Sequence, residues 1–195
     1  AELSLINTTI TLLGSHENLA AVITVPDPTA GGASRRALPI SPSRVEVRRS
    51  FIRSGGDFLS LPSTPRRGID VVLDSSLIAT EGYVIDARGW TTNASSDRGK
   101  DQVSLIRINL DRITTRTHRG FIRLESTHDE PELPVAKIVA RDSILCLTDP
   151  EAFLFQVDGH DQSVTSLRDN LSWNGTHVAY YDVSNYRRDQ NGKTG

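Results

Sequence analysis

Arginine side chains gather between residues 35 and 67, and guanidinium groups at that density could bind anions. Eight arginines and only two carboxylates, Glu46 and Asp57, give this stretch a charge of +6 in a chain whose net charge is −2. Unpaired like charges repel, so something must neutralise them. One interpretation is an ion-pair network with the acidic remainder of the chain. The other is a basic docking face for nucleic acid, another polyanion or an acidic subunit, made by Arg35, Arg36, Arg48, Arg49, Arg66 and Arg67.

The two tryptophans could bind a ligand by stacking. Gly89-Trp90-Thr91-Thr92-Asn93 and Ser172-Trp173-Asn174-Gly175-Thr176 both place an indole in a polar, turn-rich context. Sugar rings stack on aromatic faces while amides fix their hydroxyls, so Trp90, Asn93, Trp173 and Asn174 form a candidate glycan site. The alternatives are that each tryptophan covers the edge of the core or belongs to a protein interface.

Metal, cofactor and catalytic motifs are not evident. Two acidic segments, 127–132 and 158–161, offer oxygen ligands without the spacing of a calcium loop, and the five histidines include no zinc-binding pair. We find no nucleophile elbow, phosphate-binding loop or dinucleotide fingerprint. The sequence therefore predicts no metal and no cofactor. A catalytic site assembled from distant strands, as in a hydrolase on a β scaffold, stays open as an alternative.

The single cysteine, Cys146, excludes an internal disulfide and a cysteine-based metal cluster. It lies in a strand-like run, where we expect it to act as a small buried hydrophobic residue.

Strand patterns dominate the chain. Apolar residues alternate with polar ones in short runs separated by Gly, Pro, Asn or Asp, a spacing typical of antiparallel sandwiches and barrels. No alternation of strands with helices is present, which argues against a parallel sheet, and no internal repeat is apparent. The expected strands lie at 3–13, 45–51, 69–73, 77–79, 83–85, 103–110, 121–124, 135–140, 144–147, 153–157 and 178–183.

The fold we predict is an all-β antiparallel sandwich of the jelly-roll type, with long loops and at most one or two short helices. Residues 1–195 should form a single domain. Three irregular segments, at 26–42, 55–68 and 90–101, are expected loops. The chain contains no methionine, so we expect it to be a piece excised or processed from a longer precursor.

Function follows from these features only as a set of hypotheses. The first is a non-enzymatic structural or assembly subunit, such as a capsid or other virion protein, that packs into a larger particle through its loops and basic face. The others are a carbohydrate-binding module and the hydrolase already mentioned. Expected partners are therefore a second copy, a partner protein, nucleic acid or carbohydrate, with no membrane span. Four N-glycosylation sequons, at Asn7, Asn93, Asn170 and Asn174, suit a glycoprotein at an extracellular or virion surface.

Overall fold

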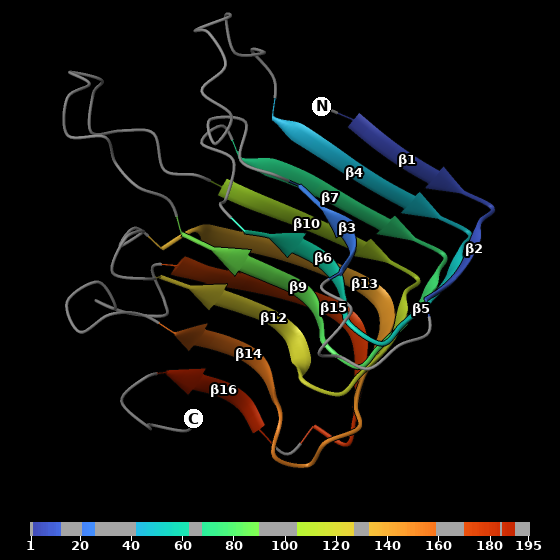
Figure 1. The fold of residues 1–195 in the computed structure, drawn as a ribbon. Helices are drawn as coiled ribbons and strands as arrows, with labels where there is room; N and C mark the ends of the chain where they lie inside the picture. Colours follow the sequence, from blue (N-terminus) through green and yellow to red (C-terminus); the bar gives the residue numbers. More distant parts are fainter. Residues whose placement is uncertain are drawn as a thin grey trace, which may run out of the picture.

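The chain winds through stacked turns of parallel β-strands. The computed structural model describes residues 2–12, 21–25, 42–62, 68–89, 105–126, 133–158, 170–183 and 185–189. Every strand pair in these ranges is parallel, and each strand pairs with its counterpart in the next turn. This arrangement is a parallel β-helix, in which one turn is a rung. Its first strand, β1, and its last, β16, lie at opposite ends of the stack (Figure 1).

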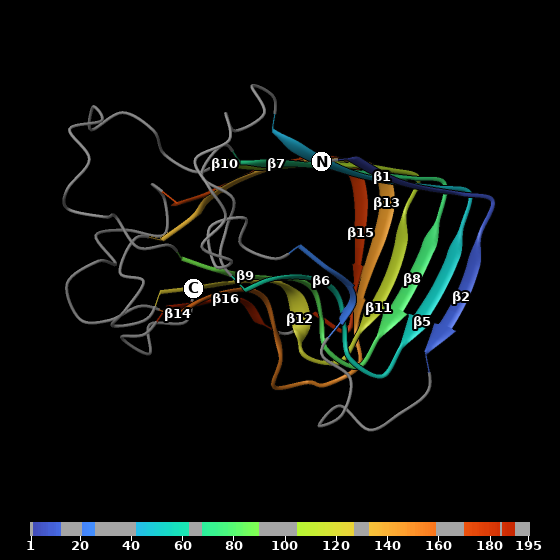
Figure 2. The same ribbon diagram turned by 45° about the horizontal axis from the view of Figure 1, so that its top comes forward.

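The strands form a ten-stranded sheet and a six-stranded sheet. The ten-stranded sheet bends into two arms. Arm 1 contains β1 (Glu2–Ile6), β4 (Ser43–Arg48), β7 (Ile69–Asp74), β10 (Leu105–Asp111) and the first halves of β13 (Val135–Leu147) and β15 (Leu171–Tyr181). Arm 2 contains β2 (Thr9–Leu12), β5 (Phe51–Ser54), β8 (Leu77–Thr80), β11 (Thr114–Thr117) and the second halves of β13 and β15. Sheet B contains β3 (Ala21–Thr24), β6 (Asp57–Leu61), β9 (Tyr83–Arg88), β12 (Gly120–Glu125), β14 (Phe153–Asp158) and β16 (Asn185–Asp189). Arm 1 and sheet B are the two facing layers, and arm 2 joins them along one side (Figure 2).

A left-handed residue turns the chain from arm 1 into arm 2 in every rung. The φ angles of these corner residues lie between 47° and 53°, and they are Asn7, Arg49, Ser75, Arg112, Asp142 and His177. One residue in this conformation reverses the side-chain alternation and bends the strand sharply. The interval between corners varies from 26 residues, Arg49 to Ser75, to 42 residues, Asn7 to Arg49.

Apolar residues of successive rungs stack on one another inside the core. Arm 1 contributes the row Val45, Val71, Ile108 and Ile138, each at most 2% exposed. Because parallel strands in register place equivalent side chains next to each other, each apolar row becomes a continuous wall. Sheet B closes the core with two consecutive buried residues in each of β6, β9, β12 and β14, such as Val84 and Ile85.

The antiparallel jelly-roll prediction is wrong. Period-2 alternation shows which face of a strand is buried, but it is the same for parallel and antiparallel partners. The prediction that no repeat exists is also wrong, because rungs of unequal length hide the period. The predicted loop 55–68 contains β6, in which Phe58, Leu59 and Leu61 have no exposed surface. The predicted strands fall on observed strands, but the prediction missed β3, β6, β11, β16 and the first half of β15.

Candidate functional site

The outer surface of arm 1 carries an ion-pair ladder. Glu46 lies between Arg44, at 3.3 Å, and Arg48. One rung further along the stack, Arg107 pairs with Asp70 at 2.8 Å, and at the corner Arg112 pairs with Asp74 at 2.7 Å. The hydroxyl of Ser75, which donates to Asp74, and the Arg112 guanidinium lower the pKa of Asp74. Opposite charges therefore alternate across the strands, but Arg44 and Arg48 pair with a carboxylate inside the stretch 35–67 and not with the acidic remainder of the chain.

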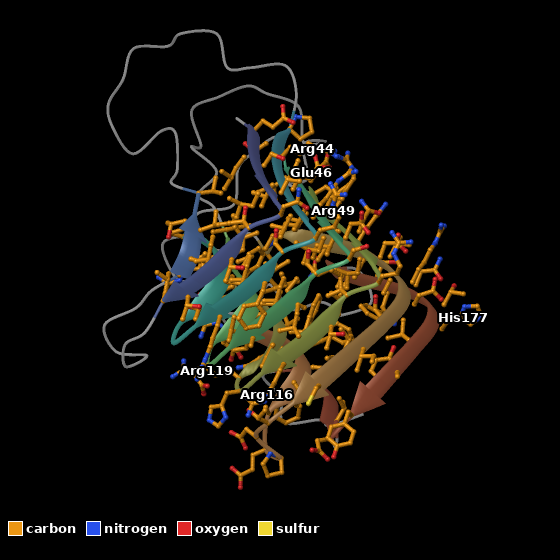
Figure 3. The ribbon with its side chains drawn as sticks, turned by 90° about the vertical axis from the view of Figure 1, so that its right-hand side faces the viewer. Arg44, Glu46, Arg49, Arg116, Arg119 and His177 are labelled. Carbon is orange, nitrogen blue, oxygen red and sulfur yellow. The ribbon has the colours of Figure 1, made fainter. Side chains whose placement is uncertain are left out.

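The predicted basic face is only partly described by the structure. Arg48 lies on arm 1 in contact with Glu46, whereas Arg49 is an exposed corner residue (Figure 3) that makes no ion pair with any described residue. Arg48 and Arg49 are consecutive in sequence, but the bend of the chain at Arg49 points their side chains to different surroundings. Four other residues of this predicted site lie outside the described ranges: Arg35, Arg36, Arg66 and Arg67.

Of the predicted tryptophan site, only Trp173 and Asn174 are described; Trp90 and Asn93 lie outside the described residues. Trp173 packs against the core, with ring centroids 5.2 Å from Phe155 and 6.4 Å from Phe121. Its indole N–H donates to the hydroxyl of Tyr180 at 3.1 Å. Trp173 therefore completes the interior of the last rung, and Asn174 is exposed beside it.

A polar network that sequence reasoning missed covers the outer face of sheet B. Arg123 on β12 donates to Asp86 on β9 at 2.8 Å and to Glu125 at 2.7 Å. Its guanidinium lies 5.3 Å from the centre of the Tyr83 ring. The Tyr83 hydroxyl donates to Gln156 on β14 at 2.9 Å. Two consecutive residues of β9, Val84 and Ile85, face the core, which explains why Tyr83 and Asp86 on either side of them share this outer face.

Burial perturbs the titration of this network. The pKa of Asp57 is raised to about 6, chiefly by burial and with a contribution from Asp86, although the Tyr83 N–H that it accepts at 2.7 Å works in the opposite direction. Burial also raises the pKa of the Tyr83 phenol. For Arg123, burial opposes the charged form, but Asp86 and Glu125 raise the pKa above its usual value.

The chemistry available to this network is limited by its own pairing. Asp57, Asp86, Arg123 and Tyr83 each already bind a neighbour, so they cross-link the strands of sheet B. Among the described residues, no group of three or more His, Cys, Asp or Glu side chains is placed to hold a metal ion.

Cys146 is half-buried on arm 2, not fully buried as expected, and desolvation raises the pKa of its thiol. A raised pKa keeps the thiol protonated and unreactive.

The two end rungs form the remaining candidate site. Their inward side chains continue the core rows but are only partly buried: Leu5, Ile10 and Val22 in the first rung, and Leu171, Trp173 and Val178 in the last. Within the described residues, β1, β2 and β3 at one end and β15 and β16 at the other each pair along one edge only. Apolar alternation in the sequence indicates that these segments are strands. Only the order of strands in the sheets shows which of them lie at the two ends of the stack.

Comparisons with protein-family models, with curated proteins and with solved structures find no match for this chain. The fold is therefore the guide to function. The parallel sheets overturn the description as a jelly-roll β-sandwich, and nothing in the fold or the comparisons supports a virion protein or a carbohydrate-binding module. In the described part of the chain, no helix is both long and apolar enough to cross a membrane.

Proposed function

We propose that this protein is a structural module that assembles end to end, the last rung of one copy pairing with the first rung of the next. The observation that carries this proposal is the pair of end rungs, whose apolar rows are half-covered while the equivalent rows of the middle rungs are buried. Open strand edges that also show apolar side chains are templates for pairing with another chain.

The register of the stack indicates how two copies would fit. Along arm 1, Leu3 belongs to the same inward row as Trp173, and Leu5 belongs to the same row as Gly175. If β1 of one copy continued the ladder of β15 in another, Leu3 would cover Trp173. Leu5 would lie beside Gly175, which has no side chain to compete for that space.

The outward rows are also compatible in this arrangement. Glu2 would meet Ser172, Ser4 would meet Asn174, and Ile6 would meet Thr176, so no pair of like charges opposes the contact. Such a contact joins two different surfaces of the same chain. Heterologous contacts of this kind generate open filaments, or rings if the rotation closes.

Sedimentation velocity across a range of protein concentrations tests the proposal. The native chain should form oligomers that grow with concentration, and electron microscopy should show particles of constant width. Leu3→Lys places a charge on the inward row of the first rung, where the leucine is 38% exposed in a single copy, and should give monomers.

Val139→Lys is the matched control, because Val139 is exposed on the outer side of arm 1 in an interior rung and should leave assembly unchanged. A native chain that stays monomeric at every concentration contradicts the proposal. So does equal assembly of the native chain and Leu3→Lys.

A further inference from the structure

The outer face of arm 2 differs in charge from the other two faces of the β-helix. Its six strand segments contain no aspartate or glutamate: 9–12, 51–54, 77–80, 114–117, 143–147 and 178–181. Two outward positions on these strands are arginines, Arg53 and Arg116, and both are exposed. Neither makes an ion pair with a described residue. On arm 1 and sheet B, by contrast, several described arginines pair with carboxylates, including Arg107 and Arg123.

The two arginines flank a small residue. Arg53 and Arg116 are both in register with Ala79, which lies on the strand between them. Adjacent strands are about 4.8 Å apart, so the two α-carbons are separated by roughly 10 Å. Because Ala79 has only a methyl group, the space between the two guanidinium groups is open to a partner. Arg49, which has no ion pair within the described ranges, adds a third cation at the corner, while Arg116 lies toward the opposite edge of the face (Figure 3).

An apolar row runs beside these cations. Phe51 and Leu77 are in register and are 39% and 38% exposed, and Ile144 in the same row is 46% exposed. A shallow groove along the corner is lined by residues that include Arg49, Ser50, Phe51, Ser76 and Leu77. The face therefore combines an apolar strip with a cationic rim on a rigid sheet.

We infer that the outer face of arm 2 binds a partner protein whose docking surface carries an apolar strip flanked by carboxylates. An apolar centre with a charged rim, rich in arginine and aromatic residues, is the usual anatomy of a protein interface. Phosphate recognition gains nothing from Leu77 and Ile144, and single-stranded nucleic acid requires several aromatic platforms where this row has one. A symmetric contact with a second copy would bring the arginines of both faces together with no carboxylate on either.

Fluorescence anisotropy with a labelled helical peptide that carries a leucine stripe flanked by glutamates tests the inference on the full chain. This leucine–glutamate peptide presents an apolar strip with carboxylates on both sides of it on one face. The native chain should bind it, and Arg53→Gln combined with Arg116→Gln should weaken binding roughly tenfold or more, since charge-assisted hydrogen bonds are lost. Lys137→Gln combined with Arg141→Gln removes the same charge from arm 1 and should have little effect.

Phe51→Thr tests the apolar strip separately. Threonine already occupies this row at Thr9 and Thr114, so the variant should fold, and an unchanged melting temperature would confirm that it does. Its affinity for the peptide should fall severalfold. Leu3→Lys should not change that affinity, which distinguishes this face from the end rungs of the proposed assembly.

Three results would overturn the inference: no binding of the leucine–glutamate peptide, equal weakening by the arm 1 and arm 2 variants, or equal or tighter binding of oligothymidylate or poly-glutamate. The last would identify a surface that recognises charge alone.

Discussion

The backbone N–H of Ser50 donates to the hydroxyl of Ser76 in the next rung, at 2.9 Å. The Ser76 hydroxyl in turn donates to the carbonyl oxygen of Asp74. The N–H of Thr8 likewise donates to the hydroxyl of Ser50, and the N–H of Ile113 donates to the hydroxyl of Ser143. The serine that follows a corner residue therefore joins two rungs where the bend interrupts the regular ladder. Ile113 stands where the next serine would be, and it is buried in the core instead.

Ser76→Ala should lower the free energy of unfolding by about 1 to 2 kcal/mol, because it leaves the buried N–H of Ser50 without its acceptor. Chemical denaturation would measure this loss, provided that the slope of the unfolding free energy against denaturant concentration is the same in the native chain and the variant. Ser4→Ala, on the exposed outer side of β1, is the control and should change stability by less than about 0.5 kcal/mol. Equal effects of the two variants would show that the serine ladder does not stabilise the corner.

Asp57→Asn should raise stability above pH 7. The pKa of Asp57 is about 6 in the folded chain, above the ordinary 3.8, so the folded state binds more protons than the unfolded state between these values. The free energy of unfolding contributed by this group is therefore largest at low pH and falls as pH rises from about 4 to about 6. Asparagine keeps the acceptor for Tyr83 N–H but carries no charge.

We expect Asp57→Asn to be more stable than the native chain by about 1 to 2 kcal/mol at pH 7.5, and to be less pH-dependent between pH 4 and 6. Thermal melts at several pH values would measure both effects. Asp70→Asn, which removes an exposed ion pair with Arg107, should cost no more than about 1 kcal/mol at pH 7.5. A loss of stability in Asp57→Asn at pH 7.5 would refute the assignment of a burial penalty to Asp57.

Thr117→Val should stabilise the protein by up to about 1 kcal/mol. The Thr117 hydroxyl is buried and has no hydrogen-bond partner among the described residues, so valine removes an unsatisfied group and keeps the shape. Thr80, in the same row of the adjacent rung, donates to the carbonyl of Gly82 at 3.3 Å. The matched variant Thr80→Val should therefore destabilise. If both variants change the free energy of unfolding in the same direction, the effect does not depend on whether the hydroxyl has a hydrogen-bond partner.

Asp142→Val should lower the free energy of unfolding by about 1 to 2 kcal/mol, because a β-branched residue tolerates the left-handed conformation poorly. Asp142 has a φ of 47° and also accepts from His177 at 3.1 Å on the surface. Asp142→Asn removes the same charge yet suits that conformation, so it should be close to the native chain in thermal denaturation. Equal losses in the two variants would assign the effect to the ion pair rather than to the backbone.

Part of the candidate site could be predicted from the sequence. The arginine cluster predicted either ion pairs or a docking face, and the structure shows that Arg48 contacts Glu46, while Arg49 turns the corner with no described ion pair. The sheet B network could not be predicted, because Tyr83, Asp86, Arg123 and Gln156 come from three separate strands. Only the stacking of rungs brings them within hydrogen-bonding distance.

The repeat was present in the sequence in a form that unequal rungs disguised. Arg49-Ser50-Phe51-Ile52, Ser75-Ser76-Leu77-Ile78 and Asp142-Ser143-Ile144-Leu145 share a corner residue, a serine and an outward–inward pair. Their spacing is irregular because rungs differ in the length of chain between a sheet B strand and the next arm 1 strand. Searching for the corner motif at variable intervals, rather than for a fixed period, would have found it.

By itself, the sequence determined where most of the arm 1 strands lie and which of their side chains face the core, because apolar alternation is a local property of each segment. The alternation alone predicts that Val45 and Val47 face the core, and both are buried. The tertiary structure decided that Val45 lies against Val71 in a parallel partner one rung away. Strand direction depends on backbone hydrogen bonds between segments far apart in the chain, and the alternation of each segment is compatible with either direction.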